Sequence, residues 1–150
     1  MDRHFCSTTY ILHKEEKKTL LHWHKKLKTW LPPGGHIEKN ESPYEAAIRE
    51  VKEEYHLSDI EYIHPNTPKR LDDRSFAMEM PHFLISEDIE PEHIHMDWIF
   101  FAKISDDEYN EIASQVNDKI KWFNIAEIRK ENNCFENVKE LAIYGMNEFY

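Results

Sequence analysis

The chain has 150 residues, and its 29 Asp and Glu outnumber its 19 Lys and Arg, which gives a formal net charge of −10. Such an acidic chain is not expected to bind polymeric nucleic acid or an anionic membrane surface, because both usually require basic patches. A chain of this length can bury about 70% of the surface that its unfolded form exposes, so we expect a single domain over residues 1–150.

The sequence has no segment that suits export or membrane insertion. Residues 1–12 lack an apolar run long enough for a signal sequence, and no stretch approaches the ~20 apolar residues of a membrane span. Cys6 and Cys134 lie far apart without C-x-x-C spacing, so neither a zinc motif nor a disulfide framework is indicated. We therefore expect a cytoplasmic protein with two reduced, structural thiols.

Two apolar segments at the start of the chain predict strands. They cover residues 5–13 and 19–23 and are separated by the charged turn KEEKK, so we expect an opening hairpin. The sequence TWLPPGGHIE then leads through a Pro-Pro-Gly-Gly turn toward a helix.

The start of that helix is well marked. Ser42 and Glu45 form an S-x-x-E capping box, and Pro43 occupies the first helical position, where its missing N–H costs nothing. At about 100° per residue, apolar residues share one side of the helix and can pack on a core. These residues are Tyr44, Ala47, Ile48, Val51 and Tyr55.

The opposite side of the helix carries Glu50, Glu53 and Glu54. Hard cations such as Mg²⁺ take oxygen ligands, usually a few carboxylates together with water and substrate phosphate. The three glutamates therefore suggest a divalent metal site in an enzyme that handles phosphates. A glutamate-rich helix can also be no more than a solvated face.

Residues 35–57, GHIEKNESPYEAAIREVKEEYHL, resemble the box of the Nudix hydrolases, which reads G, five residues, E, seven residues, R-E-aliphatic-x-E-E-x-G-aliphatic. The matching residues are Gly35, Glu41, Arg49, Glu50, Val51, Glu53, Glu54 and Leu57. One position differs, because His56 stands where the family has glycine. Glycine enters the left-handed conformation at a helix end freely, and histidine enters it less easily.

The resemblance implies hydrolysis of a pyrophosphate bond in a nucleoside diphosphate derivative or a nucleoside triphosphate, by water activated with Mg²⁺ or Mn²⁺. It implies four metal ligands, with one of the glutamates among them or a further glutamate as general base. Those ligands are Glu50, Glu53, Glu54 and the carbonyl of Gly34. Glu41 and Arg49 would form a structural ion pair that orients the helix against its loop. The alternative is a non-catalytic nucleotide-binding or regulatory module with the same fold.

Further apolar segments predict strands in the middle of the chain. We expect strands over residues 60–64, 76–85 and 95–104, with a long proline-marked loop through residue 73. In the last strand region, His93, His95 and Asp97 alternate and would project to one side. They resemble a transition-metal triad. The alternative is a polar strand end that lines the cleft, including residues that contact substrate, or that hydrogen bonds to a loop.

Acidic residues precede the last predicted strand, roughly where the family's further ligand would be expected. They are Asp106, Asp107, Glu108, Glu111 and Asp118, and a solvated acidic loop is the simpler interpretation. The remaining elements are a short strand over residues 121–123 and helices over 125–130 and 135–149.

Mixed strands with helices packed outside predict an α/β sandwich, and the resemblance implies the Nudix α/β/α sandwich with a mixed sheet. The expected partner is a small nucleotide-type substrate. A homodimer is left open, and no residue pattern identifies the base, sugar or leaving group.

Overall fold

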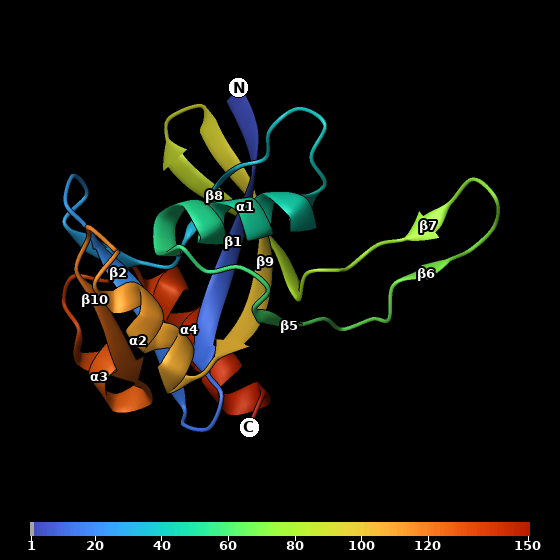
Figure 1. Ribbon diagram of the computed structural model, residues 1–150. Coiled ribbons are helices and arrows are strands. Elements are labelled where there is room, and N and C mark those ends of the chain that lie inside the picture. Colours follow the sequence, from blue (N-terminus) through green and yellow to red (C-terminus); the bar gives the residue numbers. More distant parts are fainter. Residues whose placement is uncertain (1) are drawn as a thin grey trace.

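A mixed sheet is the centre of the fold, and its two longest strands pair in parallel. A computed structural model describes residues 2–150 and is shown in Figure 1. In it, β1 (Asp2–His13) pairs with β9 (His93–Ile104) from one end to the other, with Asp2 opposite His93 and His13 opposite Ile104.

The other strands of this sheet extend outward from that parallel pair. The strand order is β10-β2-β1-β9-β5, while β3 pairs with β2, β4 with β1, and β8 with β9. The bounds are β2 (Lys18–His24), β3 (Thr29–Leu31), β4 (Gly34–His36), β5 (Glu61–Ile63), β8 (Phe83–Glu90) and β10 (Ile120–Asn124). The predicted opening hairpin is β1 with β2, which pair antiparallel.

Helices cover both faces of the sheet, and each face has its own apolar core (Figure 1). One core contains residues of α1 (Pro43–Tyr55) and α2 (Asp106–Ala113), and the other contains residues of α3 (Ile125–Lys130) and α4 (Glu136–Glu148). Because side chains alternate along a strand, Ile11 of β1 belongs to the first core, whereas Tyr10 and Leu12 belong to the second. The predicted α/β/α sandwich with a mixed sheet is confirmed.

Helix α1 begins and ends with defined caps. Both hydrogen bonds of the Ser42 and Glu45 capping box are present, and His56 ends the helix in the left-handed conformation, with φ 57° and ψ 27°. The buried face is centred on Ala47, Val51 and Tyr55. Ile48 was expected on the apolar side, but it lies at the margin of that face and is 37% exposed.

The prediction of a single strand over residues 76–85 is wrong. Its first part, β7 (Phe76–Ala77), pairs with β6 (Lys69–Arg70) in a separate two-stranded sheet, and β8 begins only at Phe83. Pro81 lies between the two parts and has no N–H to donate to a ladder. Residues 69–77 form a hairpin that projects from the body of the molecule (Figure 1).

The solvated loop expected over the acidic residues before β10 is also wrong in part, because residues 106–113 form α2. Ser105 and Glu108 make a complete capping box there, with the same S-x-x-E spacing as at α1. Among residues 2–150, no helix combines the length and apolarity that a membrane crossing requires.

Replacing His56 by glycine should stabilise the protein. A side chain in the left-handed region carries a backbone cost that glycine avoids, so we expect His56→Gly to raise the free energy of unfolding by about 0.5–1 kcal/mol. The measurement is the urea midpoint at unchanged m-value. His56→Ala is the control, because alanine keeps the backbone cost. An equal gain from alanine would contradict this explanation.

Candidate functional site

The strand β4 passes so close to its neighbours that two positions on it have no room for a side chain. A Cβ atom on Gly35 would lie 2.5 Å from Oε1 of Glu50, and one on Gly34 would lie 2.7 Å from the carbonyl oxygen of Ser7. Neither glycine has a positive φ, so close approach rather than backbone conformation requires them. The carboxylate of Glu50 therefore lies directly against the backbone of β4.

Arg49 connects the loop before α1 to the acidic side of the helix. Its Nε and Nη2 donate to the two carboxylate oxygens of Glu41, at 2.6 and 3.0 Å. Nη2 also donates to the carbonyl of His36 at 2.9 Å, and Nη1 donates to Glu50 at 2.8 Å and to Glu53 at 3.3 Å. The hydrogen bonds that Glu41 accepts from Arg49 lower the pKa of Glu41. A single planar guanidinium thus joins the loop to two of the three helical glutamates.

Glu54 has a buried carboxylate oxygen without a hydrogen-bond partner among residues 2–150. Burial, followed by the neighbouring carboxylate of Glu50, raises the pKa of Glu54 to about 8, and the charge of Asp118 adds to the increase. A backbone hydrogen bond at Gly34 acts in the opposite direction. Burial and the neighbouring carboxylate therefore disfavour the ionised form of Glu54.

The nearest basic group does not neutralise Glu54. His22 Nε2 lies 3.9 Å from Glu54 Oε2, and His22 Nδ1 lies 2.9 Å from the hydroxyl of Tyr55. Burial lowers the pKa of His22 to about 4, so its ring is uncharged at neutral pH and the contact with Glu54 is not an ion pair. The uncharged imidazole of His22 therefore does not neutralise Glu54, and the buried Oε2 of Glu54 needs another partner.

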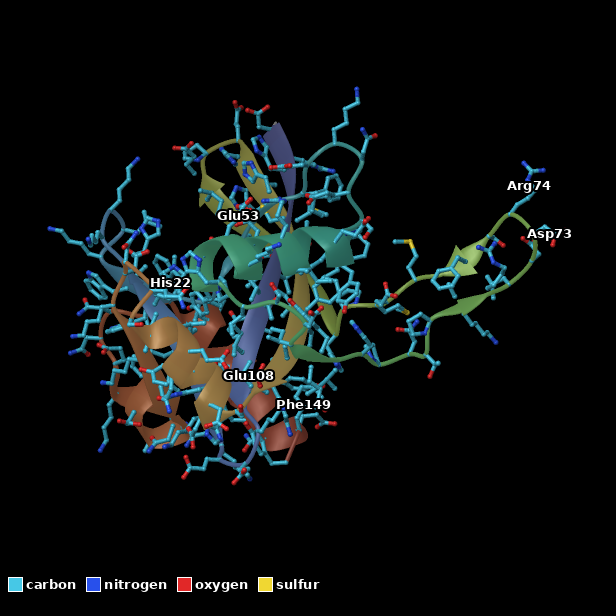
Figure 2. All side chains as sticks on the ribbon, in the orientation of Figure 1. His22, Glu53, Asp73, Arg74, Glu108 and Phe149 are labelled. Carbon is cyan, nitrogen blue, oxygen red and sulfur yellow. The ribbon has the colours of Figure 1, made fainter. Side chains whose placement is uncertain are left out.

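These donors fit a hard divalent cation. Glu50 and Glu54 are one helical turn apart on α1, and Glu50 lies close enough to raise the pKa of Glu54. A cation between such carboxylates would take oxygen ligands and relieve the unpartnered Oε2. Glu53, labelled in Figure 2, is the most exposed of the three, at 59%, and its carboxylate accepts from the same Arg49 Nη1 that donates to Glu50.

Glu54 borders a cavity of about 420 Å³ that extends across β1 and β9. Gly34, Gly35 and Asp97 also line it. The hydroxyl of Thr8 donates to the carboxylate of Asp97, lying 2.9 Å from each oxygen. Burial, followed by the nearby Glu87, raises the pKa of Asp97 to about 8. The cavity therefore has acidic groups of unusually high pKa on two of its walls.

The acidic residues outside the helix have different surroundings. Glu108, labelled in Figure 2, belongs to the capping box of α2 and lies 3.6 Å from Lys14 Nζ. Asp106 contacts His13 Nε2 at 2.8 Å. Asp118 is the one whose charge reaches the site, because it raises the pKa of both Glu54 and His22. The sequence alone marks Asp118 only as one of several acids and does not single out His22. The only signal for His22 was its alternation with His24 on β2.

The residues His93, His95 and Asp97 do not form one group of ligands. Asp97 is hydrogen bonded to Thr8, whereas His93 and His95 lie beside His4 of β1. Ligand atoms of His4, His93 and His95 all lie within 4.8 Å of one another. The expected alternation holds, but the third member of the cluster comes from another strand.

A sequence profile described as NUDIX domain matches residues 4–141. No curated protein matches the sequence significantly. The structure is similar to that of a NUDIX family hydrolase from Clostridium perfringens, with 28% identity, a TM-score of 0.76 and 100% of each chain covered. A mutT/nudix family protein from Listeria innocua has 21% identity and a TM-score of 0.63, with 99% of this chain and 96% of that chain covered. The C. elegans Ap4A hydrolase has 19% identity and a TM-score of 0.58, with 97% of this chain and 92% of that chain covered.

The raised pKa of Glu54 predicts how stability depends on pH when divalent cations are removed. The folded protein holds this proton up to about pH 8, whereas the unfolded chain releases it near 4.5. The stability that the bound proton contributes is therefore complete below 4.5 and is lost as the pH rises through about 8. In a chelator, Tm should fall over this range.

The variant Glu54→Gln should weaken that dependence, because glutamine does not titrate. Glu61→Gln is the matched control, since Glu61 is exposed and lies on β5. The Glu61→Gln variant should show the same decrease of Tm with pH as wild type. If thermal unfolding shows that Tm falls equally with pH in wild type and Glu54→Gln, a group other than Glu54 causes the pH dependence.

Proposed function

The chain belongs to the NUDIX domain family and is a Nudix-type hydrolase, and from this premise we propose that it cleaves a pyrophosphate bond in a nucleoside diphosphate derivative or a nucleoside triphosphate. We propose Mg²⁺ as the cofactor, with Mn²⁺ able to replace it. The observation that carries this proposal is the buried, unpartnered carboxylate oxygen of Glu54, which lies beside Glu50 on the wall of a cavity.

Three glutamates and one backbone carbonyl would hold the cation. Glu50 and Glu54 are already close together, and the exposed Glu53 accepts one 3.3 Å hydrogen bond from Arg49. The carbonyl of Gly34 completes the proposed set. When bound, Mg²⁺ would offset negative charge on the phosphate oxygens and lower the pKa of water.

The proton released by the attacking water needs an acceptor in the same place. We assign that role to the set Glu50, Glu53 and Glu54. Glu54 has a pKa of about 8 in the absence of a cation, so it can exchange a proton near neutral pH. A neighbouring positive charge would favour its ionised form, which is the form that accepts a proton.

Arg49 and Glu41 are positioning residues in this proposal. Their paired hydrogen bonds of 2.6 and 3.0 Å attach α1 to the loop that follows β4. The same guanidinium holds Glu50 at 2.8 Å, so the direction of that carboxylate depends on the pair. Lysine at position 49 would keep the charge and lose the fork of donors.

The charge of the chain makes the cation necessary for substrate binding as well. The formal net charge is −10, and the cavity is lined by Glu87 together with the carboxyl groups of Glu54 and Asp97. A polyanionic phosphate would be repelled from such a cavity unless a cation lies between the two. Metal dependence is therefore expected to be strict.

The first test is product release from a panel of nucleotide derivatives, with and without Mg²⁺. Wild type should hydrolyse at least one member, and Glu53→Gln and Glu54→Gln should lose about 100-fold or more of kcat/KM, because each removes a carboxylate from the reacting centre. The control Glu61→Gln should retain wild-type activity.

Two outcomes would contradict the proposal. Activity retained in both glutamine variants would place the metal site elsewhere. Saturable nucleotide binding by wild type without turnover, in Mg²⁺ and in Mn²⁺, would favour the non-catalytic module with the same fold.

A further inference from the structure

Imidazoles from three strands gather on one face of the sheet, at the end where β1 and β9 begin. The parallel register places His4 directly opposite His95, and His93 opposite Asp2. On the other side of β1, the antiparallel register places His36 of β4 opposite Cys6. Because alternate residues share a face, His4 and Cys6 of β1 lie on the same side as His93 and His95 of β9.

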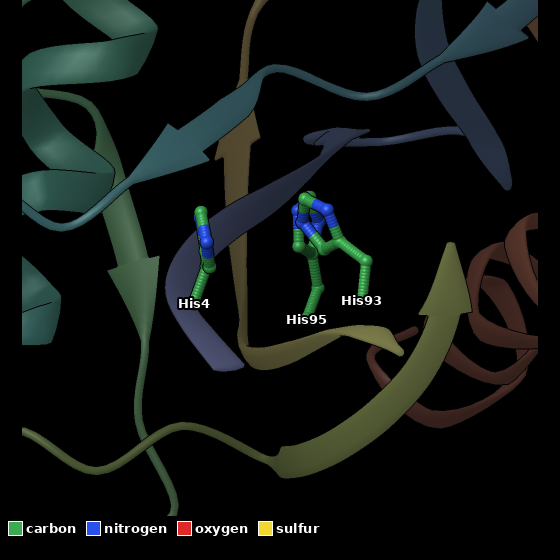
Figure 3. Close-up of side chains that lie close together, drawn as sticks. All are labelled: His4, His93 and His95. Atoms are coloured by element: carbon green, nitrogen blue, oxygen red, sulfur yellow. The ribbon is translucent and has the colours of Figure 1, made fainter. Parts of the chain in front are cut away.

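The rings of this cluster are in mutual contact. Ring centroids lie 4.5 Å apart for His4 and His93, 5.0 Å for His93 and His95, and 5.9 Å for His4 and His95. Figure 3 shows the rings of His93 and His95 together beside that of His4. Each of the three offers a ring nitrogen, and the three nitrogens lie within 4.8 Å of one another.

His93 has the arrangement expected of a metal ligand. Its Nδ1 lies 3.5 Å from a carboxylate oxygen of Glu90, and its Nε2 is buried without a hydrogen-bond partner among residues 2–150. Histidines that bind metals generally direct one ring nitrogen to a carboxylate or carbonyl, which fixes the ring and leaves the other nitrogen for the ion. A buried nitrogen with nothing to bond otherwise costs free energy.

Acidic residues lie on the neighbouring strand, where they would offset the charge of a cation. In the antiparallel register of β8 with β9, Glu87 is opposite His95 and Glu90 is opposite His93. His95 also lines the cavity that contains Glu54. The cluster is therefore a separate set of donors at the border of the proposed active site.

We infer that His4, His93 and His95 bind a transition-metal ion of the Zn²⁺ class through three imidazole nitrogens. Imidazole suits Zn²⁺, Ni²⁺ and Cu²⁺, whereas Mg²⁺ prefers the oxygen donors of the helix. Three protein ligands leave a fourth position for water or another oxygen donor. The ion would tie β1 to the β8 and β9 hairpin independently of the carboxylate site.

A second set of donors shares His95 and must be distinguished from this one. Ligand atoms of Cys6, His36 and His95 also lie within 4.8 Å of one another. That set does not use His93, so it leaves the buried Nε2 unpartnered and gives Glu90 no role. We therefore assign the ion to the three histidines.

The test is a competition titration with Zn²⁺ on the full chain without an affinity tag, in excess Mg²⁺ so that the carboxylate site is occupied. We expect one Zn²⁺ per chain, with a Tm that rises on binding. His4→Ala and His93→Ala should each weaken binding by more than the ~10-fold to 100-fold typical of losing an outer partner, and Glu90→Gln should fall within that range.

Three further variants make the result specific. His56→Asn removes an exposed imidazole outside the cluster, and Glu54→Gln removes a carboxylate of the other site, so both should bind Zn²⁺ as wild type does. Cys6→Ser should also bind normally, and Co²⁺ substitution should give a visible spectrum without a thiolate charge-transfer band. Thermal unfolding of each metal-free variant checks that it is folded.

The inference is overturned by any of four results. These are an absence of stoichiometric Zn²⁺ binding by wild type, unchanged binding in folded His4→Ala and His93→Ala, loss of binding in Cys6→Ser, or loss of binding in Glu54→Gln. The third result would move the ion to Cys6, His36 and His95. The fourth would move it to the carboxylates of α1.

Discussion

Parallel pairing of β1 with β9 is the constraint on which the rest of the structure depends. The two strands lie about 90 residues apart in the sequence and align over their full lengths, from Asp2 opposite His93 to His13 opposite Ile104. Both apolar cores are built on them, because alternate residues of each strand face opposite sides of the sheet. A slip of one residue would exchange the two faces of the strand that slips and turn its polar end away from the cavity.

The pairing of β1 with β9 also explains how a stable fold can contain carboxyl groups whose ionised forms are disfavoured. Glu54 and Asp97 are carboxyl groups in positions that disfavour their ionised forms, and Thr8 contributes the hydrogen bonds that hold Asp97. Perturbed carboxyl groups of this kind are concentrated at functional sites, since the surrounding fold must compensate for them. Here the compensation comes from two cores that do not include either carboxylate.

Local patterns in the sequence were sufficient to predict some helices and strands, but not others. The capping box of Ser42, the proline at position 43 and the spacing of the glutamates predicted α1 and its acidic side, because each is a property of neighbouring residues. Ser105 and Glu108 carry the same signal for α2, which is short and mostly polar, so the segment looked like a loop. The cluster around His93 depends on the register between β1 and β9, which sequence alternation alone does not contain.

The projecting hairpin has a consequence for how this protein can vary. Within the described chain, residues 65–80 contribute nothing to either core, and their hydrogen bonds to Asn66 and Asp72 close within the segment. Because loop-closure entropy grows only slowly with length, residues 65–80 can be lengthened, shortened or exchanged at little cost to the free energy of folding. The segment is therefore a natural place for divergence between relatives that share the sheet and the acidic helix.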